Sequence, residues 1–500
     1  MTIGDFRDAP DPGALFLRLW DLATSWSYTQ RDDAVRREDM SQALKDDLLM
    51  NDDGGQAVTA LIDALEETET GAADRLMGVV LDAMQAIDEV FDHIHPRHPV
   101  LAPAKAPRRR LPAWLINAQE GRTLGRPFAQ DDRRHLVPRG PFTAGPRLAA
   151  TLNGETLEDR FVALTAAPRF LLAHGREIEI LSQVVGHDLF SGVPPGREAG
   201  QETIGVVAVA ERAGDLEAVR TERNGSPHLD IRVRASLAAG ERFFDGVQKL
   251  GSLDIAMAPE LTLSEVQAAI YADRLSRMTA DAPRLSVAGS GGSDRIDDRG
   301  RRENLSIMYN GVGAELWRHR KVWPYKMTPE QVAFMRWEPI SQGQTLAEDM
   351  IDGDHFTIAD IDSLGRVLTL ICQDFEIQPA VAEAIRLYQP DWVLVPILDT
   401  GVSFNRWPHR TAHRLSGQSN ARFVVASSLA LADQAGIDDY TSTPMAILVG
   451  PHDPTAGGPA GDTPRLIGTV RCNGKGVMCG KLTWGRGEHW TQAALGATDN

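Results

Sequence analysis

Short apolar runs, separated by longer amphipathic or glycine-bearing stretches, follow one another from about His228 to the end of the chain. The clearest of these runs are LDIRVRASL, SLDIAMAPE, RLSVAGSG, LSIMYNG, VLTLIC, DWVLVPIL and ARFVVASS. Short apolar runs indicate buried strands, and their alternation with amphipathic segments is typical of an α/β fold. The pattern therefore predicts an α/β domain over residues 228–495.

The upstream half of the chain changes character twice. Residues 1–95 are predicted to be helical, because apolar residues recur at helical spacing up to a stop at Pro96. Residues 96–147 contain PRHPVLAPAKAPRRRLPAW, which predicts a linker or extended arm rich in proline and arginine. Residues 148–227 mix helical and strand-like pieces and predict a mixed α/β extension. With 500 residues, the chain exceeds the ~250–300 that one core supports.

Charge and cysteine content exclude several classes of protein. The 69 acidic residues outnumber the 52 basic ones, giving a net charge of −17 that disfavours a nucleic-acid partner. Three cysteines are too few for a disulfide framework, and the acidic start MTIGDFRDAPDPG is unlike a signal peptide. Because no apolar run approaches the ~18 residues of a membrane span, we expect a cytoplasmic protein without a membrane partner.

Three residues at the ends of apolar runs or after a basic segment carry the chemistry of covalent acyl transfer. Glu260 ends SLDIAMAPE, Lys321 stands in AELWRHRKVWPY, and Cys372 ends LTLIC. A cysteine nucleophile needs a base to take its proton and a cation to stabilise negative charge, which are roles that fit Glu260 and Lys321. The backbone N–H of Gln373 is a natural second donor. Taken alone, these residues also allow a purely structural interpretation. A cysteine at the end of a strand is commonly a small buried apolar residue, and Pro-Glu after a strand is often only a turn.

Metal ligation is not expected from the remaining clusters. His93, His95 and His98 lie between prolines, without the spacing of a zinc site. Cys472 and Cys479 match no common zinc spacing either, and a C-terminal hairpin turning at Asn473-Gly474 is the better interpretation of RCNGKGVMCG.

The order of these motifs resembles the nitrilase superfamily of carbon-nitrogen hydrolases. The motifs are APE at 258–260, ENLSIMYNGVGAELWRHRK at 303–321, ICQDF at 371–375 and AIRLYQPDWVLVPI at 384–397. The resemblance covers about residues 228–495 and implies a four-layer α-β-β-α sandwich preceded by the N-terminal helical and mixed region. The sequence departs from the family at Gln373, where an aromatic residue is common, and at VWPYKM after Lys321.

The resemblance also implies roles for individual residues. Cys372 would be the nucleophile, Glu260 the general base and Lys321 the transition-state stabiliser. Many members have a second glutamate that orients the lysine, and Glu330, with Glu338 as competitor, lies at about the right distance. The family implies no metal or organic cofactor, and a homodimer or larger homo-oligomer.

These inferences lead to two hypotheses for function. The first is hydrolysis of a nonpeptide amide or nitrile through a thioester, with acyl transfer to an amine left open. The second is a catalytically weak or inactive scaffold or sensor, whose residues 1–227 bind a protein partner and carry the output, for instance in a bacterial defence or other multi-protein system.

Overall fold

The computed structural model describes most of the chain. The described ranges are 3–32, 38–68, 73–96, 110–140, 156–185, 201–278, 281–361, 364–417, 419, 421–452, 465–471, 477–485 and 489–492. The proposed turn at Asn473-Gly474, together with His98 and Cys472, lies outside these ranges. Within them, no helix is both long and apolar enough to cross a membrane.

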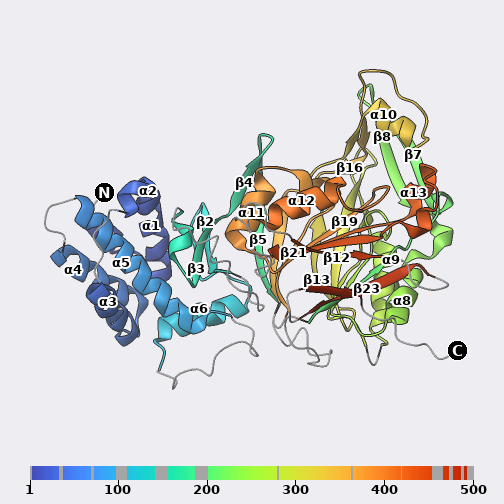
Figure 1. Ribbon diagram of the computed structural model, residues 1–500. Helices are drawn as coiled ribbons and strands as arrows, with labels where there is room; N and C mark the ends of the chain where they lie inside the picture. The colour runs from blue at the N-terminus through green and yellow to red at the C-terminus, as the bar shows by residue number, and fades with distance from the viewer. Residues whose placement is uncertain are drawn as a thin grey trace.

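Two large sheets dominate the described residues (Figure 1). One has eight strands, in the order β22 (Arg465–Val470), β21 (Ala446–His452), β20 (Arg422–Ser427), β19 (Trp392–Ile397), β18 (Gly365–Thr369), β17 (His355–Ile361), β5 (Arg176–Val185) and β4 (Phe170–Ala173). The other has nine described strands, seven of them in the order β11 (Gly291–Ile296), β12 (Arg302–Asn310), β10 (Leu285–Val287), β9 (Ile255–Met257), β6 (Thr203–Val207), β23 (Cys479–Gly485) and β24 (His489–Gln492). Two more strands, β13 (Glu315–Arg320) and β16 (Met350–Ile351), pair with β12.

The apolar cores define the layers. One core lies between the two sheets and combines Ile255 and Met257 of one sheet with Trp392 and Leu394 of the other. On the outer faces, helices α8 (Ala239–Leu250) and α9 (Glu265–Leu275) cover the nine-stranded sheet, and α11 (Ala380–Tyr388) and α12 (Trp407–Ser416) cover the eight-stranded one. The predicted four-layer α-β-β-α sandwich is therefore confirmed.

The sheets begin upstream of residue 228. β5 pairs in parallel with β17, and β6 pairs in parallel with β9, so both strands from the expected extension lie inside the large sheets. Their side chains explain this placement, because Ile178, Ile180, Ile204 and Val206 are buried in the sandwich cores. An extension without these strands would leave apolar edges of both sheets exposed.

The described residues within 1–95 are mainly helical, and they share one apolar core with residues between 114 and 166. The helices of this N-terminal region are α1 (Pro12–Thr24), α2 (Tyr28–Asp32), α3 (Glu38–Met50), α4 (Gly54–Thr68), α5 (Ala73–Phe91) and α6 (Ala113–Thr123), with a small sheet of β1 (Ala129–Gln130), β2 (Arg134–Pro138) and β3 (Leu164–Pro168). Helix α1 begins where the Asp11 side chain accepts the Ala14 N–H, and Pro12 occupies its first turn.

The prediction of a linker or extended arm over residues 96–147 is wrong for residues 110–140. These residues form α6, β1 and β2, and α6 buries Trp114 and Leu115 in the N-terminal core. Pro112 was one of the prolines that indicated a linker, but it stands at the N-cap of α6, where proline is compatible with the start of a helix. Residues 97–109 of the Pro/Arg-rich segment lie outside the described residues.

A small cap sits at one end of the sandwich. It contains the sheet β14 (Lys326–Met327), β15 (Leu346–Glu348), β8 (Ser226–Val233) and β7 (Leu216–Arg223), together with α10 (Pro329–Phe334) and α13 (Ala430–Gln434). Figure 1 shows α10, β7 and β8 at the upper right of the molecule, with α13 beside them at the right. Leu229, Met327, Val332 and Leu346 form the core of the cap.

Candidate active site

Glu260 lies three residues after β9 and is 2% exposed. Its carboxylate accepts hydrogen bonds from Lys321 Nζ at 2.7 Å, Asn304 Nδ2 at 3.1 Å and the Leu398 N–H at 2.9 Å. Beside it, Gly289 has φ +56°, and a Cβ there would lie 2.1 Å from the Pro259 carbonyl oxygen. Only glycine therefore lets β10 end this close to the Pro-Glu turn.

Lys321 directly follows β13 and is 1% exposed. Its backbone N–H donates to the Asn304 carbonyl at 2.9 Å, which holds the residue against β12. The ammonium donates to Glu260 and to Glu348 Oε2, and Asn304 Nδ2 donates to Glu348 Oε1 at 2.8 Å. Lys321 and Asn304 thus both bridge the same two carboxylates.

The second glutamate at this lysine is Glu348, so the prediction of Glu330 or Glu338 is wrong. Glu330 is exposed in the first turn of α10, where a hydrogen bond with Thr328 lowers the pKa of its carboxyl. Glu338 is also exposed and lies at 4.0 Å from Arg220. Glu348 reaches Lys321 because β15 pairs with β8 and brings its last residue beside the end of β13.

Cys372 begins a short 3₁₀ helix, η7 (Cys372–Glu376), three residues after β18. Its φ of +46° is in the left-handed region, which a residue with a side chain occupies only when the surroundings impose it. Those surroundings include Asp374, whose Oδ1 accepts the N–H groups of Val322 and Trp323, each at 3.0 Å. Asp374 therefore joins the cysteine turn to the two residues after Lys321.

The charges of the site are coupled. Burial, the Glu260 charge and a hydrogen bond with Glu260 raise the pKa of Cys372 well above its usual value, against the opposing effect of Lys321. Burial also raises the pKa of Glu260, despite the lysine beside it. Burial alone would lower the pKa of Lys321, but Glu260 and Glu348 raise it well above its usual value. The resting site thus holds a thiol, a carboxyl group of raised basicity and a permanent ammonium.

The Gln373 N–H is near the start of η7. The first hydrogen bond of this turn runs from the Asp374 N–H to the Ile371 carbonyl at 3.0 Å, one residue later. The Gln373 amide directly follows Cys372 and precedes that bond, and its role as a second donor stays a prediction.

A cavity of about 220 Å³ opens onto these groups. Cys372, Glu260, Lys321 and Glu348 line its reactive end. The loop after β19 adds Asp399, which accepts from Arg406 at 2.9 Å and from the Trp407 indole. Among the described residues, no three His, Cys, Asp or Glu side chains are grouped to hold a metal ion.

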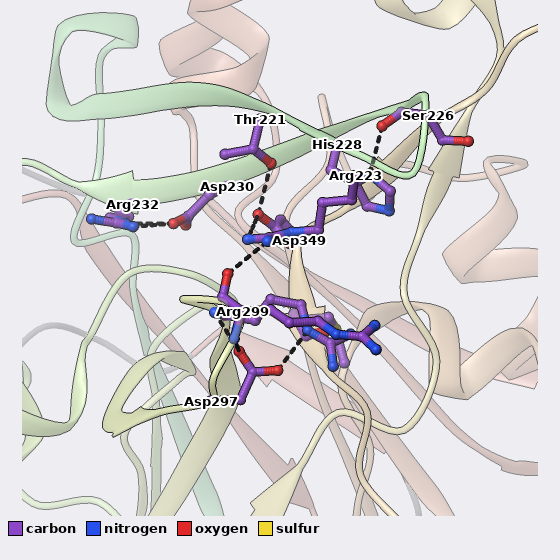
Figure 2. A network of polar contacts seen from close by, with 11 residues as sticks. Thr221, Arg223, Ser226, His228, Asp230, Arg232, Asp297, Arg299 and Asp349 are labelled. Carbon is purple, nitrogen blue, oxygen red and sulfur yellow. Dashed lines mark hydrogen bonds and ion pairs between the residues drawn. The ribbon is translucent and has the colours of Figure 1, made fainter.

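A polar network fixes the cap next to Glu348 (Figure 2). Asp349, the next residue, accepts from Arg223 Nε and Nη2 and from the Thr221 hydroxyl at 2.7 Å. Arg223 Nη1 also donates to the Arg299 carbonyl at 2.6 Å, and the Asp349 N–H donates to the Leu229 carbonyl at 2.9 Å. The β7–β8 hairpin is thereby attached to the strand that carries Glu348.

Comparison with known proteins finds similar entries among solved structures. No family model and no curated protein matches the chain. Nit3 of Saccharomyces cerevisiae, a member of branch 10 of the nitrilase superfamily, is 11% identical over 58% of this chain and 91% of its own, with a TM-score of 0.35. An amidase from Nesterenkonia sp. is 15% identical over 57% and 91%, with a TM-score of 0.35.

A third similar structure is the glutamine-dependent NAD+ synthetase from Acinetobacter baumannii. It is 11% identical over 60% of this chain and 49% of its own, with a TM-score of 0.34. At this identity we take no function from the comparisons and rely on the geometry of the site.

Proposed function

We propose that the protein hydrolyses a nonpeptide carbon-nitrogen bond, in an amide or nitrile, with Cys372 as nucleophile. The observation that supports this most strongly is the meeting of a thiol, a carboxyl group and an ammonium at one end of one cavity. Cys372, Glu260 and Lys321 come from three segments far apart in the sequence, yet all three are buried and line the same space. Burying such a set costs free energy, which a purely structural role does not require.

In the first half-reaction on an amide, Cys372 Sγ attacks the carbonyl carbon while Glu260 takes the thiol proton. The raised pKa of Glu260 makes it a stronger base than an exposed carboxylate. The negative oxygen that forms is stabilised by the Lys321 ammonium and the Gln373 N–H. Collapse breaks the C–N bond, Glu260 returns the proton to the leaving nitrogen, and a thioester remains on Cys372.

In the second half-reaction, Glu260 removes a proton from water as the water oxygen attacks the thioester carbon. The C–S bond then breaks, the acid is released, and the proton returns to the cysteine sulfur. An amine in place of water would give acyl transfer by the same steps, and these residues serve both reactions. No step requires a metal or an organic cofactor.

Labelling with fluoroacetamide tests this proposal. In the wild type, Cys372 Sγ should displace fluoride from the methylene carbon of the electrophile, and peptide mapping by mass spectrometry would locate the resulting S–CH2 adduct. Lys321→Ala and Glu260→Gln should each slow labelling by about 100-fold, since a well-placed donor or base contributes 10²–10⁴. Glu330→Gln, a matched change on an exposed carboxylate, should label at the wild-type rate.

A rate of Cys372 labelling that is the same in Lys321→Ala, Glu260→Gln and the wild type would contradict the proposal. Circular dichroism and thermal melts of each variant exclude unfolding as the cause of a slower rate. Labelling of Cys479 is not expected, because this residue is buried in β23, away from the cavity.

The scaffold or sensor function is the second candidate. The observation that favours it is the separate apolar core of the N-terminal helices, which supplies no residue that lines the cavity. Residues of this region would then bind a protein partner and carry the output. A cellular phenotype that survives Cys372→Ala would favour this candidate over catalysis. A homodimer or larger assembly remains a prediction, which sedimentation of the purified chain would test.

A further inference from the structure

The part of the cavity lining that the cap and its neighbouring loops supply is mostly apolar. Its side chains come from the cap and from the loops beside it: Leu229, Ile231, Met327, Phe334, Met335, Trp337 and Leu431. Several of them also pack together in the two small cores of the cap. A substrate bound with its C–N bond at Cys372 would therefore direct its remaining part against hydrocarbon and indole surfaces.

Charge on the cavity wall disfavours an anionic substrate. Among the described residues that line the cavity, the cations are Lys321 and Arg406. Lys321 is bound to two carboxylates, and Arg406 donates to Asp399 at 2.9 Å and to the Thr400 hydroxyl at 2.8 Å. A carboxylate on the substrate would face Glu260, Glu348 and Asp399, while both lining cations already hold ion pairs with carboxylates, so its burial would carry an electrostatic cost.

The cavity volume indicates the size of the acyl group that the cavity can enclose. A closed apolar cavity of ~150 Å³ accommodates benzene. The cavity here measures about 220 Å³, which leaves room for a carboxamide beside one ring or a branched chain of similar bulk. A peptide or a two-ring acyl group would exceed this space.

The apolar wall is also held at a fixed distance from the reacting groups. Leu229 stands opposite Glu348 in the parallel pairing of β8 with β15. The Asp349 contacts with Arg223 and Thr221, drawn in Figure 2, secure the same hairpin. Because the wall and the glutamate that binds Lys321 are joined in this way, the wall selects which acyl groups bring their carbonyl to Cys372.

We infer that the substrate is an uncharged carboxamide with one compact apolar acyl group, about the size of a phenyl or branched aliphatic group. This inference rests on the proposed function of the same site. Phenylacetamide represents the class, acetamide lacks the apolar group, and 4-carboxyphenylacetamide adds a carboxylate, with its negative charge and its bulk, to the same ring.

The test measures protection of Cys372 against fluoroacetamide by each of the three amides. Phenylacetamide should protect at a concentration at least about tenfold lower than either of the others, since one methylene group in an apolar pocket already changes discrimination ~10-fold or more. Ile231→Ala should weaken protection by phenylacetamide at least about fivefold and leave that by acetamide unchanged. Val219→Ala, on the exposed side of the same hairpin, is the control and should match the wild type.

The outcomes separate the inference from the proposed function. Normal labelling with equal or better protection by acetamide or by the carboxylate overturns the inference alone, as does normal labelling without any protection. Labelling that is absent, or that does not depend on Lys321 and Glu260, overturns the proposed function, and the inference with it.

Discussion

Replacement of Glu348 by glutamine tests the arrangement around Lys321 most informatively. Glu348 Oε2 accepts from the Lys321 ammonium and from the Tyr325 N–H at 3.2 Å, and Oε1 accepts from Asn304 at 2.8 Å. Glu348→Gln preserves the shape but removes the charge and one acceptor. A hydrogen bond to a charged group contributes ~1.5–3 kcal/mol, so we expect the Cys372 labelling rate to fall roughly 10- to 100-fold.

The pH dependence of that rate gives a second readout, which a merely structural role of Glu348 would not move. After burial, the charge of Glu348 is one of the causes that raise the pKa of Glu260. Removal of the charge therefore lowers the pKa of Glu260. Since Glu260 must be ionised to take the thiol proton, the acidic limb of the rate profile should move to lower pH in Glu348→Gln.

The assay is the second-order rate of fluoroacetamide labelling between pH 4.5 and 9, buffered at constant ionic strength. Glu330→Gln and Glu338→Gln are the matched controls and should give wild-type rates and profiles, since both residues are exposed. A fall in Glu330→Gln equal to that in Glu348→Gln would refute our placement of the second glutamate. An acidic limb that moves upward would refute the electrostatic reasoning.

Two further predictions concern stability. Asp374→Ala removes the acceptor of the Val322 and Trp323 N–H groups, and at ~1–3 kcal/mol for each unsatisfied buried donor it should lower the free energy of unfolding by roughly 2–5 kcal/mol in urea titrations. Asp374→Asn retains one acceptor oxygen and should lower the free energy of unfolding by less. Equal losses in the two variants would contradict the role of Asp374 as acceptor of the Val322 and Trp323 N–H groups. Burial raises the pKa of Asp88 to about 6, against the opposing effect of three backbone N–H donors. The folded state therefore binds this proton more tightly than the unfolded one, and the stability that Asp88 contributes below pH ~4 is lost as pH rises to ~6, by ~3 kcal/mol. Asp88→Asn should remove that slope from urea titrations at pH 4, 5 and 6, and an unchanged slope would contradict the assignment.

The meeting of Glu260, Lys321 and Cys372 at one cavity could be expected from the sequence, because two of these residues follow an apolar run directly. APE and LTLIC both change from an apolar run to a reactive side chain at the point where the strand ends. The strands themselves follow the predicted runs, as β9, β12, β18, β19 and β20 show. Strand ends in a sandwich meet at one edge, so these residues could be expected to converge.

Glu348 could not be found in this way. Its strand β15 has three residues, and its position depends on parallel pairing with β8, more than a hundred residues upstream. Spacing after Lys321 favoured Glu330, but that residue belongs to the exposed first turn of α10. The only local signal is the apolar Leu346-Ala347 pair before the acid, which is too short to indicate a buried strand.

The predicted start of the α/β domain at residue 228 was wrong for a related reason. β5 and β6 are apolar on the faces that enter the sandwich, but their partners β17 and β9 lie far away in the chain, and no motif marks them. Similarly, the prolines of PRHPVLAPAKAPRRRLPAW suggested an arm, although the last of them, Pro112, directly precedes α6. In both cases the deciding contacts are non-local, so tertiary packing overrides the local composition.

The most direct test of the central claim is mass spectrometry of the protein quenched in acid during turnover of an amide such as phenylacetamide. We expect an acyl adduct on the peptide that contains Cys372, and hydroxylamine should release it. The Cys372→Ala variant should carry no such adduct and should release no ammonia from the amide. Ammonia release that continues in Cys372→Ala, with no adduct in the wild type, would contradict this claim.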